Sequence, residues 1–399
     1  MTTTLIDEAR APRRGRDGGL TESFDVSENR AMATGCPTEP AMPRDAGRTG
    51  RPSLALAFAM GLVIAAAAPA QWVTRDARWP LRGDWNWTLS RQLPDLYLEF
   101  NGIDFGHAHL AETLLRSSAP EDVERARLEI LDFIASMPSV PPDEEQVAPT
   151  FVRLVWEAQR SFDWAHSLHR SLYDLFASDV ADKEAAYRAI VDDYLSKPEA
   201  ITRHALDHHG ALWSFPESHA FRDRHARANA QIWAYHWLQA AVADVQRQGS
   251  AARQRDLMPR ILDRYHGYLR EPPVDWRFMP MFHEVAPEFS GHHPEAAAIF
   301  DNLHMLHDNL DDVLSRPDLF PTHEARRVRI LEILEVYLHS SHEPVDHHPE
   351  VHVAGANAEP DDGHAGHGQP AKHSEIEGPR PPSALQVLEG EAGGGHVHG

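Results

Sequence analysis

The chain has 399 residues and a formal net charge of −22, and because its first 70 residues hold eight positive and eight negative side chains, the whole excess lies in residues 71–399. A surface this acidic repels phosphate backbones, which disfavours a nucleic-acid partner. The single cysteine, Cys36, excludes an intramolecular disulfide, a zinc or iron–sulfur site made of several cysteines, and a c-type haem attachment.

The amino-terminal region combines two kinds of sequence. Residues 1–50 are rich in Gly, Arg, Thr and Pro without apolar periodicity, so we expect a disordered leader, or a start assigned too early, since Met42 would begin a leader of normal length. Residues 51–70 read as a signal peptide, with an arginine, an Ala-rich apolar stretch and a small-residue cleavage signal that ends at Ala70. The alternative is a retained membrane anchor, although the stretch is short for a span of about 20 apolar residues. Residues 71–91 are expected to be a linker, and both interpretations place the rest of the chain outside the cytoplasm, in the periplasm or the extracellular space.

Residues 92–343 predict an all-α domain. Apolar residues recur at spacings of three and four, prolines separate the apolar runs, and alternating strand patterns are missing. Residues 162–175, 232–245 and 300–313 align without gaps, residues 103–107 match the first part of the pattern, and a second apolar helix follows each. We therefore predict four tandem helical hairpin repeats, packed as a bundle or as a short α-solenoid. The aligned positions include His107, His166, His236 and His304, and further along Asp174, Asp244 and Asp312.

Two of these segments carry a pattern that suits a metal site. Residues three and four apart share a helix face, so His166 projects with His169, and His304 projects with His307. Asp163 and Asp301 precede the two pairs by one turn and are candidate ligands or hydrogen-bond partners of the imidazoles. We expect the two faces to converge on one transition metal. Zinc, copper and non-haem iron suit this nitrogen-rich set better than calcium or magnesium.

Other histidines also recur at equivalent positions and are weaker metal candidates. His209 and His283 each lie fifteen residues after a repeated tyrosine, and His225 and His293 each lie eleven residues before a repeated histidine. His107 and His236 complete the candidate set. For these residues the alternative is a structural role in packing or capping, which we favour for His236 because aromatic residues surround it in the sequence. A b-type haem held by two histidines between helices is a further alternative.

The carboxy-terminal segment differs in composition. Nine of the 27 histidines lie from His342 onward, among Pro, Gly, Ala and Glu. We expect residues 344–399 to form a disordered His-rich tail, since such a segment cannot bury enough apolar surface to fold. Tracts of this kind chelate transition metals loosely.

These patterns favour an exported His-rich helical protein that binds a transition metal for capture, buffering or delivery. One alternative is an exported metalloenzyme with a His/Asp site between helices. Another is an α-helical scaffold that binds a second exported protein, with structural histidines. A membrane partner is expected only if residues 53–70 are retained. No nucleophile elbow, phosphate-binding glycine loop or His-Glu-x-x-His motif is present.

If residues 51–70 are a signal peptide, the mature protein begins at Gln71, because small residues flank the expected cleavage position. Amino-terminal sequencing of the protein from its native host measures this directly. Recovery of a cytoplasmic product that retains residues 1–50 would contradict the prediction.

Overall fold

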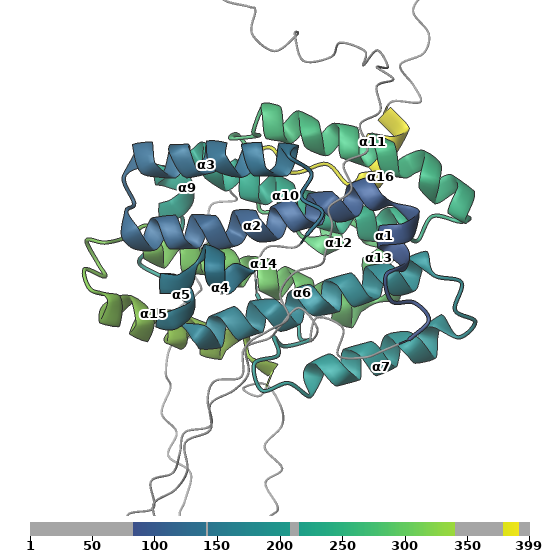
Figure 1. Cartoon of the computed structure of the whole chain (residues 1–399), viewed down its shortest axis with the longest axis horizontal. Helices are drawn as coiled ribbons and strands as arrows, with labels where there is room; N and C mark the ends of the chain where they lie inside the picture. The colour runs from purple at the N-terminus through teal and green to yellow at the C-terminus, as the bar shows by residue number, and fades with distance from the viewer. Residues whose placement is uncertain (1–82, 141–142, 208–214, 340–377, 391–399) are drawn as a thin grey trace, which may run out of the picture. The chain divides into compact units, whose positions relative to one another are not determined.

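The computed structural model of the chain describes residues 83–140, 143–207, 215–339 and 378–390 (Figure 1). These residues are mainly helical and include no strand, and one isolated antiparallel bridge joins Ile201 and Leu338. The all-α prediction is confirmed for this part of the chain. The proposed signal peptide, His209 and most of the His-rich tail lie outside the described residues. No helix within the described ranges is long and apolar enough to cross a membrane, a finding that does not extend to residues 53–70.

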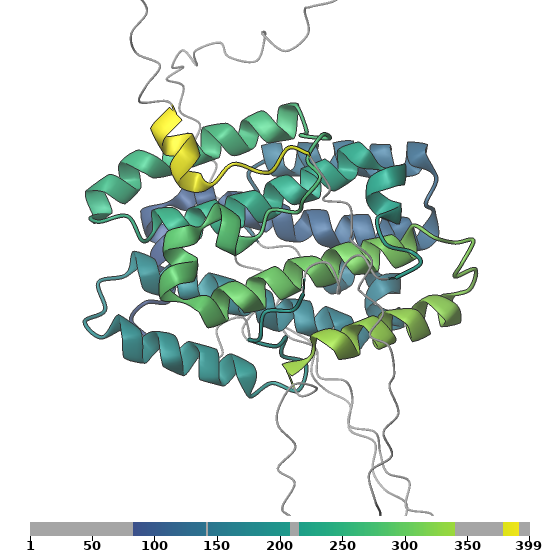
Figure 2. The same cartoon turned by 180° about the vertical axis from the view of Figure 1, so that it is seen from behind.

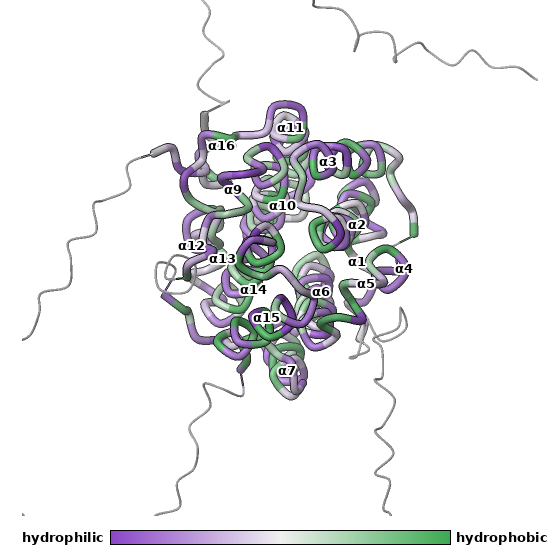
Figure 3. Tube along the Cα trace, turned by 90° about the vertical axis from the view of Figure 1, so that its left-hand side faces the viewer, coloured by the Kyte–Doolittle hydropathy of each residue, from purple (hydrophilic) through white to green (hydrophobic). Residues whose placement is uncertain are grey.

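Four long helices carry the aligned histidines, and each packs against the long helix that follows it in the chain. Figure 3 views the helices nearly end-on and shows the His-bearing helices toward the middle, with three of their partners, α3, α7 and α11, toward the outside. The four pairs are α2 (Pro94–Arg116) with α3 (Pro120–Ala135), α6 (Trp156–Ala177) with α7 (Lys183–Leu195), α10 (Ala226–Val245) with α11 (Ala251–Arg270), and α14 (Pro294–Leu314) with α15 (His323–Tyr337).

A short helix precedes each His-bearing helix. A single non-helical residue separates the two, with φ between −136° and −132° and ψ between 47° and 65°. Proline follows this residue at the start of α2 and of α14, where its fixed φ suits the first helical position. The short helices are α1 (Thr88–Gln92), α5 (Pro149–Leu154), α9 (Ala220–Arg224) and α13 (Pro287–His292), and two more, α4 (Glu144–Val147) and α12 (Phe282–Val285), lie before α5 and α13. Residues 71–91 were expected to be a linker, but helix α1 begins inside this segment, at Thr88. The folded part of the chain therefore begins earlier than expected.

Carboxylates from the long helices cap the short ones. Asp174 of α6 accepts hydrogen bonds from the backbone N–H groups of Trp87 and Leu89, both at 2.7 Å, at the start of α1. Asp312 of α14 caps α9 in the same way, at 2.8 Å from two N–H groups. Asp244 of α10 accepts from Phe289 of α13, and Glu112 of α2 accepts from two N–H groups of α5. The first N–H groups of a helix have no partner within it, so these carboxylates tie each short helix to a neighbouring long one.

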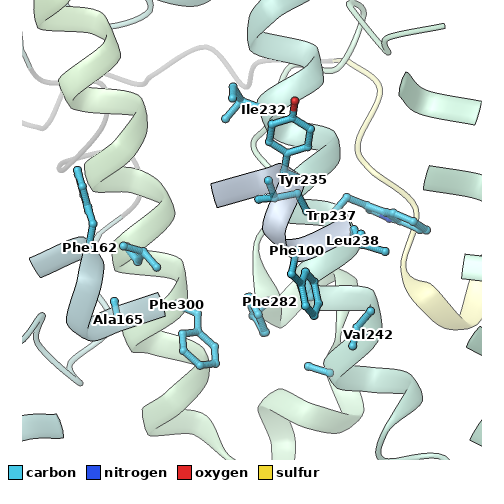
Figure 4. Packing of buried hydrophobic residues seen from close by; sticks show 14 of the residues in the cluster. Phe100, Phe162, Ala165, Ile232, Tyr235, Trp237, Leu238, Val242, Phe282 and Phe300 are labelled. Atoms are coloured by element: carbon cyan, nitrogen blue, oxygen red, sulfur yellow. The ribbon is translucent and has the colours of Figure 1, made fainter. Parts of the chain in front are cut away.

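Helices α10 and α14 are buried on all sides. Every residue from Ala228 to Val245, and from Ala296 to Leu314, is buried. Helix α10 has apolar residues on every side, interrupted by buried polar ones such as His236, Gln239 and Asp244, and apolar residues on all sides are expected of a helix in the middle of a bundle. Figure 4 shows part of this core, in which Trp237 and Phe300 are both fully buried.

The chain near its carboxy terminus departs from the predicted disordered tail. Residues 378–390 include helix α16 (Ala384–Gly390), which packs on α10 and α11 (Figure 2). The indole N–H of Trp237 donates to the carbonyl of Pro382 at 2.8 Å. Ala384, Val387 and Leu388 are buried, and their spacing of three and four makes one apolar helix face. The sequence analysis did not identify this short apolar helix face, because the segment as a whole is polar in composition.

The capping carboxylates predict a specific loss of stability. Asp174→Ala leaves the N–H groups of Trp87 and Leu89 without their acceptor, one of them fully buried, so we expect the free energy of unfolding to fall by about 1–3 kcal/mol at pH 7. Urea denaturation measures the change. Asp132→Ala, at an exposed position of α3, is the matched control and should change the value by no more than about 0.5 kcal/mol. Equal losses in the two variants would show that the cap does not stabilise the fold.

Candidate metal centre

Six imidazole rings from the four long helices meet in the interior. The two histidine pairs predicted to converge do lie together, since the ring centres of His166 and His307 are 5.7 Å apart and those of His169 and His304 are 6.0 Å apart. His107 of α2 and His236 of α10 join them. The ring of His107 lies 4.5 Å from that of His307, and the ring of His236 stacks on that of His304 at 3.8 Å.

Three of these histidines have the geometry of a ligand set. His107, His236 and His307 each offer a ring nitrogen, and the three nitrogens lie within 4.8 Å of one another. The Nε2 atoms of His107 and His236 are 3.4 Å apart. Two imidazole nitrogens bound to one tetrahedral zinc at about 2.0–2.1 Å are separated by about 3.3 Å. The spacing of His107 and His236 therefore matches that of two ligands of one ion, and a ring nitrogen of His307 lies within 4.8 Å of both.

The cluster leaves many polar atoms without partners. Among the described residues, eight buried ring nitrogens of the six histidines accept or donate no hydrogen bond, including both nitrogens of His169 and both of His307. Burying a polar group without a hydrogen bond costs free energy, and such groups are rare in folded proteins. The Nε2 atoms of His107 and His236 contact each other and are not among these nitrogens, so an ion held by those two atoms and by His307 would satisfy one of them, on His307. The nitrogens concerned are His107 Nδ1, His166 Nδ1, His169 Nδ1 and Nε2, His236 Nδ1, His304 Nδ1, and His307 Nδ1 and Nε2.

The surroundings keep the rings uncharged. Burial, followed by electrostatic repulsion from His166, lowers the pKa of His107 from 6.5 to about 3. Burial is also the main reason why the pKa values of His236 and His307 lie well below 6.5. A neutral imidazole offers the lone pair that a metal needs, so this environment prepares the trio for ligation at pH 7.

Neighbouring side chains fix the orientation of the remaining rings. The Nε2 of His304 lies 3.0 Å from the amide oxygen of Gln239, to which it can donate. The ring of His169 lies 3.6 Å from that of Phe300, and the ring of His307 lies 4.1 Å from that of Phe162. Phenylalanine side chains thus pack against the rings of His169 and His307, while Gln239 contacts the ring of His304.

The other predicted site residues lie elsewhere. Asp163 accepts a hydrogen bond from the amide of Gln159 at 3.0 Å. Asp301 accepts from the backbone N–H of Phe282 and lies 3.3 Å from the ring of His283, so it caps α12. Neither aspartate is part of the trio, because Asp163 pairs with Gln159 on its own helix and Asp301 caps α12. His225 and His293 are the non-helical residues before α10 and α14, where burial lowers the pKa of each to about 4.

A pocket borders the trio on one side. His107 and His307 line it, together with His166, while fully buried His236 does not. The pocket is partly open to solvent, and its cavity volume of about 30 Å³ is room for about two water molecules. Its remaining walls come from α2, α4, α5, α6 and α14 and are mainly apolar.

The chain matches no known protein family, and no curated protein or solved structure shows significant similarity to it.

The unpartnered nitrogens of His307 predict an unusual gain of stability. His307→Leu removes two buried polar atoms that make no hydrogen bond, so the metal-free protein should unfold with a free energy higher by about 1 kcal/mol or more. Urea denaturation in the presence of a chelator measures this.

His304→Leu, one turn earlier on the same helix, is the matched control. It leaves the amide oxygen of Gln239 without its partner, so the free energy of unfolding should rise less than in His307→Leu, or should fall. A marked loss of stability in His307→Leu would assign His307 to packing.

Proposed function

We propose that the protein binds one transition-metal ion at the trio of His107, His236 and His307. The observation that carries this proposal is the convergence of one ring nitrogen each from His107, His236 and His307 within 4.8 Å, in a cluster in which eight buried ring nitrogens have no hydrogen-bond partner. A structural role explains a single buried histidine, but it does not explain six on four helices. Each unpartnered nitrogen lowers stability unless a ligand compensates for it.

The chemistry of the trio favours zinc or copper. All three ligands are neutral imidazoles, which suit both ions. Non-haem iron sites of the common kind use two histidines and a carboxylate on one face, and no carboxylate belongs to the trio. A b-type haem is less well supported, because the macrocycle would have to lie between rings whose nitrogens are 3.4 Å apart.

We further infer that the four helix pairs are equivalent repeats. In support, each His-bearing helix follows a short helix and a single non-helical residue of similar φ and ψ. Asp174, Asp244 and Asp312, which the sequence alignment matches, each cap a short helix. The trio then draws one histidine from each of the first, third and fourth repeats.

Export through residues 51–70 is part of the same proposal. In an exported protein, the trio would hold a metal acquired outside the cytoplasm, and the His-rich stretch after residue 342 would raise the local concentration of ions. His236 and His307 are buried and His107 is half-buried, which favours storage or retention of the ion over rapid transfer.

Metal binding to the folded state predicts a thermal shift. An ion that binds the native trio but not the unfolded chain raises the melting temperature, and 100-fold excess over the dissociation constant contributes about 2.7 kcal/mol. We expect Zn²⁺ or Co²⁺ to raise the melting temperature of the full-length protein by several degrees. The double variant His236→Leu with His307→Leu should lose this shift.

His323→Gln is the matched control, since His323 is exposed at the start of α15 and should leave the shift intact. Histidines that are equally available in the folded and the unfolded chain can also chelate metal, but such binding does not raise the melting temperature. A metal-dependent rise therefore reports binding to the folded state, as at the trio. The absence of a metal-dependent shift, or its persistence in the double variant, would overturn the proposal.

A further inference from the structure

The pocket beside the trio leads from solvent to two of its members. His107 and His307 line the pocket, whereas His236 lies behind them with none of its surface exposed. Because the pocket is partly open to solvent, an ion that travels along it reaches His107 and His307 first.

The pocket is too narrow for a hydrated ion. Its cavity volume of about 30 Å³ is room for about two water molecules, whereas a divalent ion in water carries a full shell of them. An ion therefore enters only after most of this shell is lost, and the loss is costly unless protein groups replace the water. The apolar lining residues, which cannot do so, are Ala108, Ala111, Phe151, Phe162, Leu310 and Leu314.

Two polar side chains of the pocket are placed to replace water. Glu144 of α4 and His166 of α6 both line it, and a carboxylate oxygen of Glu144 lies 3.9 Å from the Nδ1 of His166. Two ligands bound to one ion at about 2 Å can be up to about 4 Å apart, so this pair can hold an ion between its two atoms. The side chains of His166 and Glu144 are only 10% and 11% exposed, and the Nδ1 of His166 has no hydrogen-bond partner among the described residues.

His166 also lies within reach of the trio. The centre of its ring is 5.7 Å from that of His307 and 6.1 Å from that of His107. Two imidazoles bound to one zinc ion at about 2.0–2.1 Å have ring centres about 5–6 Å apart. An ion held by His166 can therefore gain a ligand of the trio before it leaves His166. The nitrogens of His166 are not among the three that group within 4.8 Å, so His166 is not part of the final ligand set.

We propose that the metal ion of the trio enters and leaves through this pocket, and that Glu144 and His166 bind it in transit. The proposal rests on the metal site proposed above. Glu144 attracts the cation, since a cleft that carries one sign of charge concentrates ions of the other sign, and its carboxylate replaces part of the lost water. His166 then passes the ion to His307 and His107.

The rates of metal entry and release test the proposal. The full-length protein is mixed with Co²⁺, whose visible spectrum reports ligation, and the loaded protein is then mixed with excess EDTA to follow release. The kinetic phase that is absent from the double variant His236→Leu with His307→Leu belongs to the trio. In this phase, Glu144→Gln should slow both entry and release by about fivefold or more, because both directions pass the same carboxylate.

Slower release is the decisive sign for Glu144. If its carboxylate only offset the charge of the bound ion, Glu144→Gln would weaken binding and speed release. Unchanged or faster release in this variant would therefore overturn the proposal. Glu121→Gln, the same change at an exposed position of α3, is the matched control and should alter neither rate.

His166→Phe separates a ligand in transit from a resident ligand. The substitution keeps a ring and removes both nitrogens, so release should slow, while the affinity at equilibrium stays within about threefold of the wild-type value because the trio is intact. Faster release with a lower affinity would identify His166 as a fourth protein ligand, and unchanged rates would show that it takes no part. Either outcome would overturn its role in transit.

A variant that narrows the pocket tests the route itself. Ala111→Leu adds bulk from α2 without altering a polar group, so it should slow entry and release and keep the metal-dependent thermal shift. Ala135→Leu, at an exposed position at the end of α3, should change neither. Unchanged rates in Ala111→Leu would show that the ion takes another route.

The route and the metal site fail in distinguishable ways. If metal raises no melting temperature, the metal site itself is wrong. If the thermal shift is present but Glu144→Gln and Ala111→Leu exchange the ion at the wild-type rates, the metal site stands and the route is wrong.

Discussion

Six imidazole rings in the middle of a helical bundle set the main constraint on this structure. Core positions of a bundle are normally filled by hydrocarbon side chains, whose burial is favourable, whereas an imidazole brings two polar atoms that require partners. His169 and His307 find no such partner for either nitrogen within the described residues. The fold thus places a destabilising group at the point where its four long helices meet. This is expected of a site that is completed by a ligand rather than of a site selected for packing.

The capping carboxylates explain how the helices tolerate this centre. Asp174 joins α6 to α1, and Asp312 joins α14 to α9. Each of these long helices is thus tied to a short helix that precedes a different long helix, α2 or α10. Burial raises the pKa of Asp174 to about 6, although its two backbone donors oppose the shift. These ties act at the ends of the long helices, away from the imidazoles. They can hold the rings in position before an ion arrives, which is the preorganisation that a metal site requires.

The sequence predicted part of this site because helix periodicity is a local property. The spacing in His166/His169 and His304/His307 places each pair on one face, and the structure brings both pairs to the interior. Asp301 shares that spacing, but its carboxylate caps α12, a helix that begins 19 residues earlier in the chain. No local pattern reveals such a partner. The sequence analysis favoured a packing role for His236 because its neighbours in the sequence are aromatic. Helix α10 is buried on all sides, however, so a residue between aromatic neighbours in the sequence can still face the rings of His107, His304 and His307.

The charge of the ligand set has a consequence for any ion bound at the trio. Three neutral imidazoles leave the full positive charge of a divalent ion in a mostly apolar interior, where an uncompensated charge is costly. Asp104, which is paired with the buried Arg170, favours positive charge on His107, and a carboxylate oxygen of Glu144 lies 3.9 Å from the Nδ1 of His166. Neither carboxylate belongs to the trio, so each can offset part of the charge of an ion without ligating it.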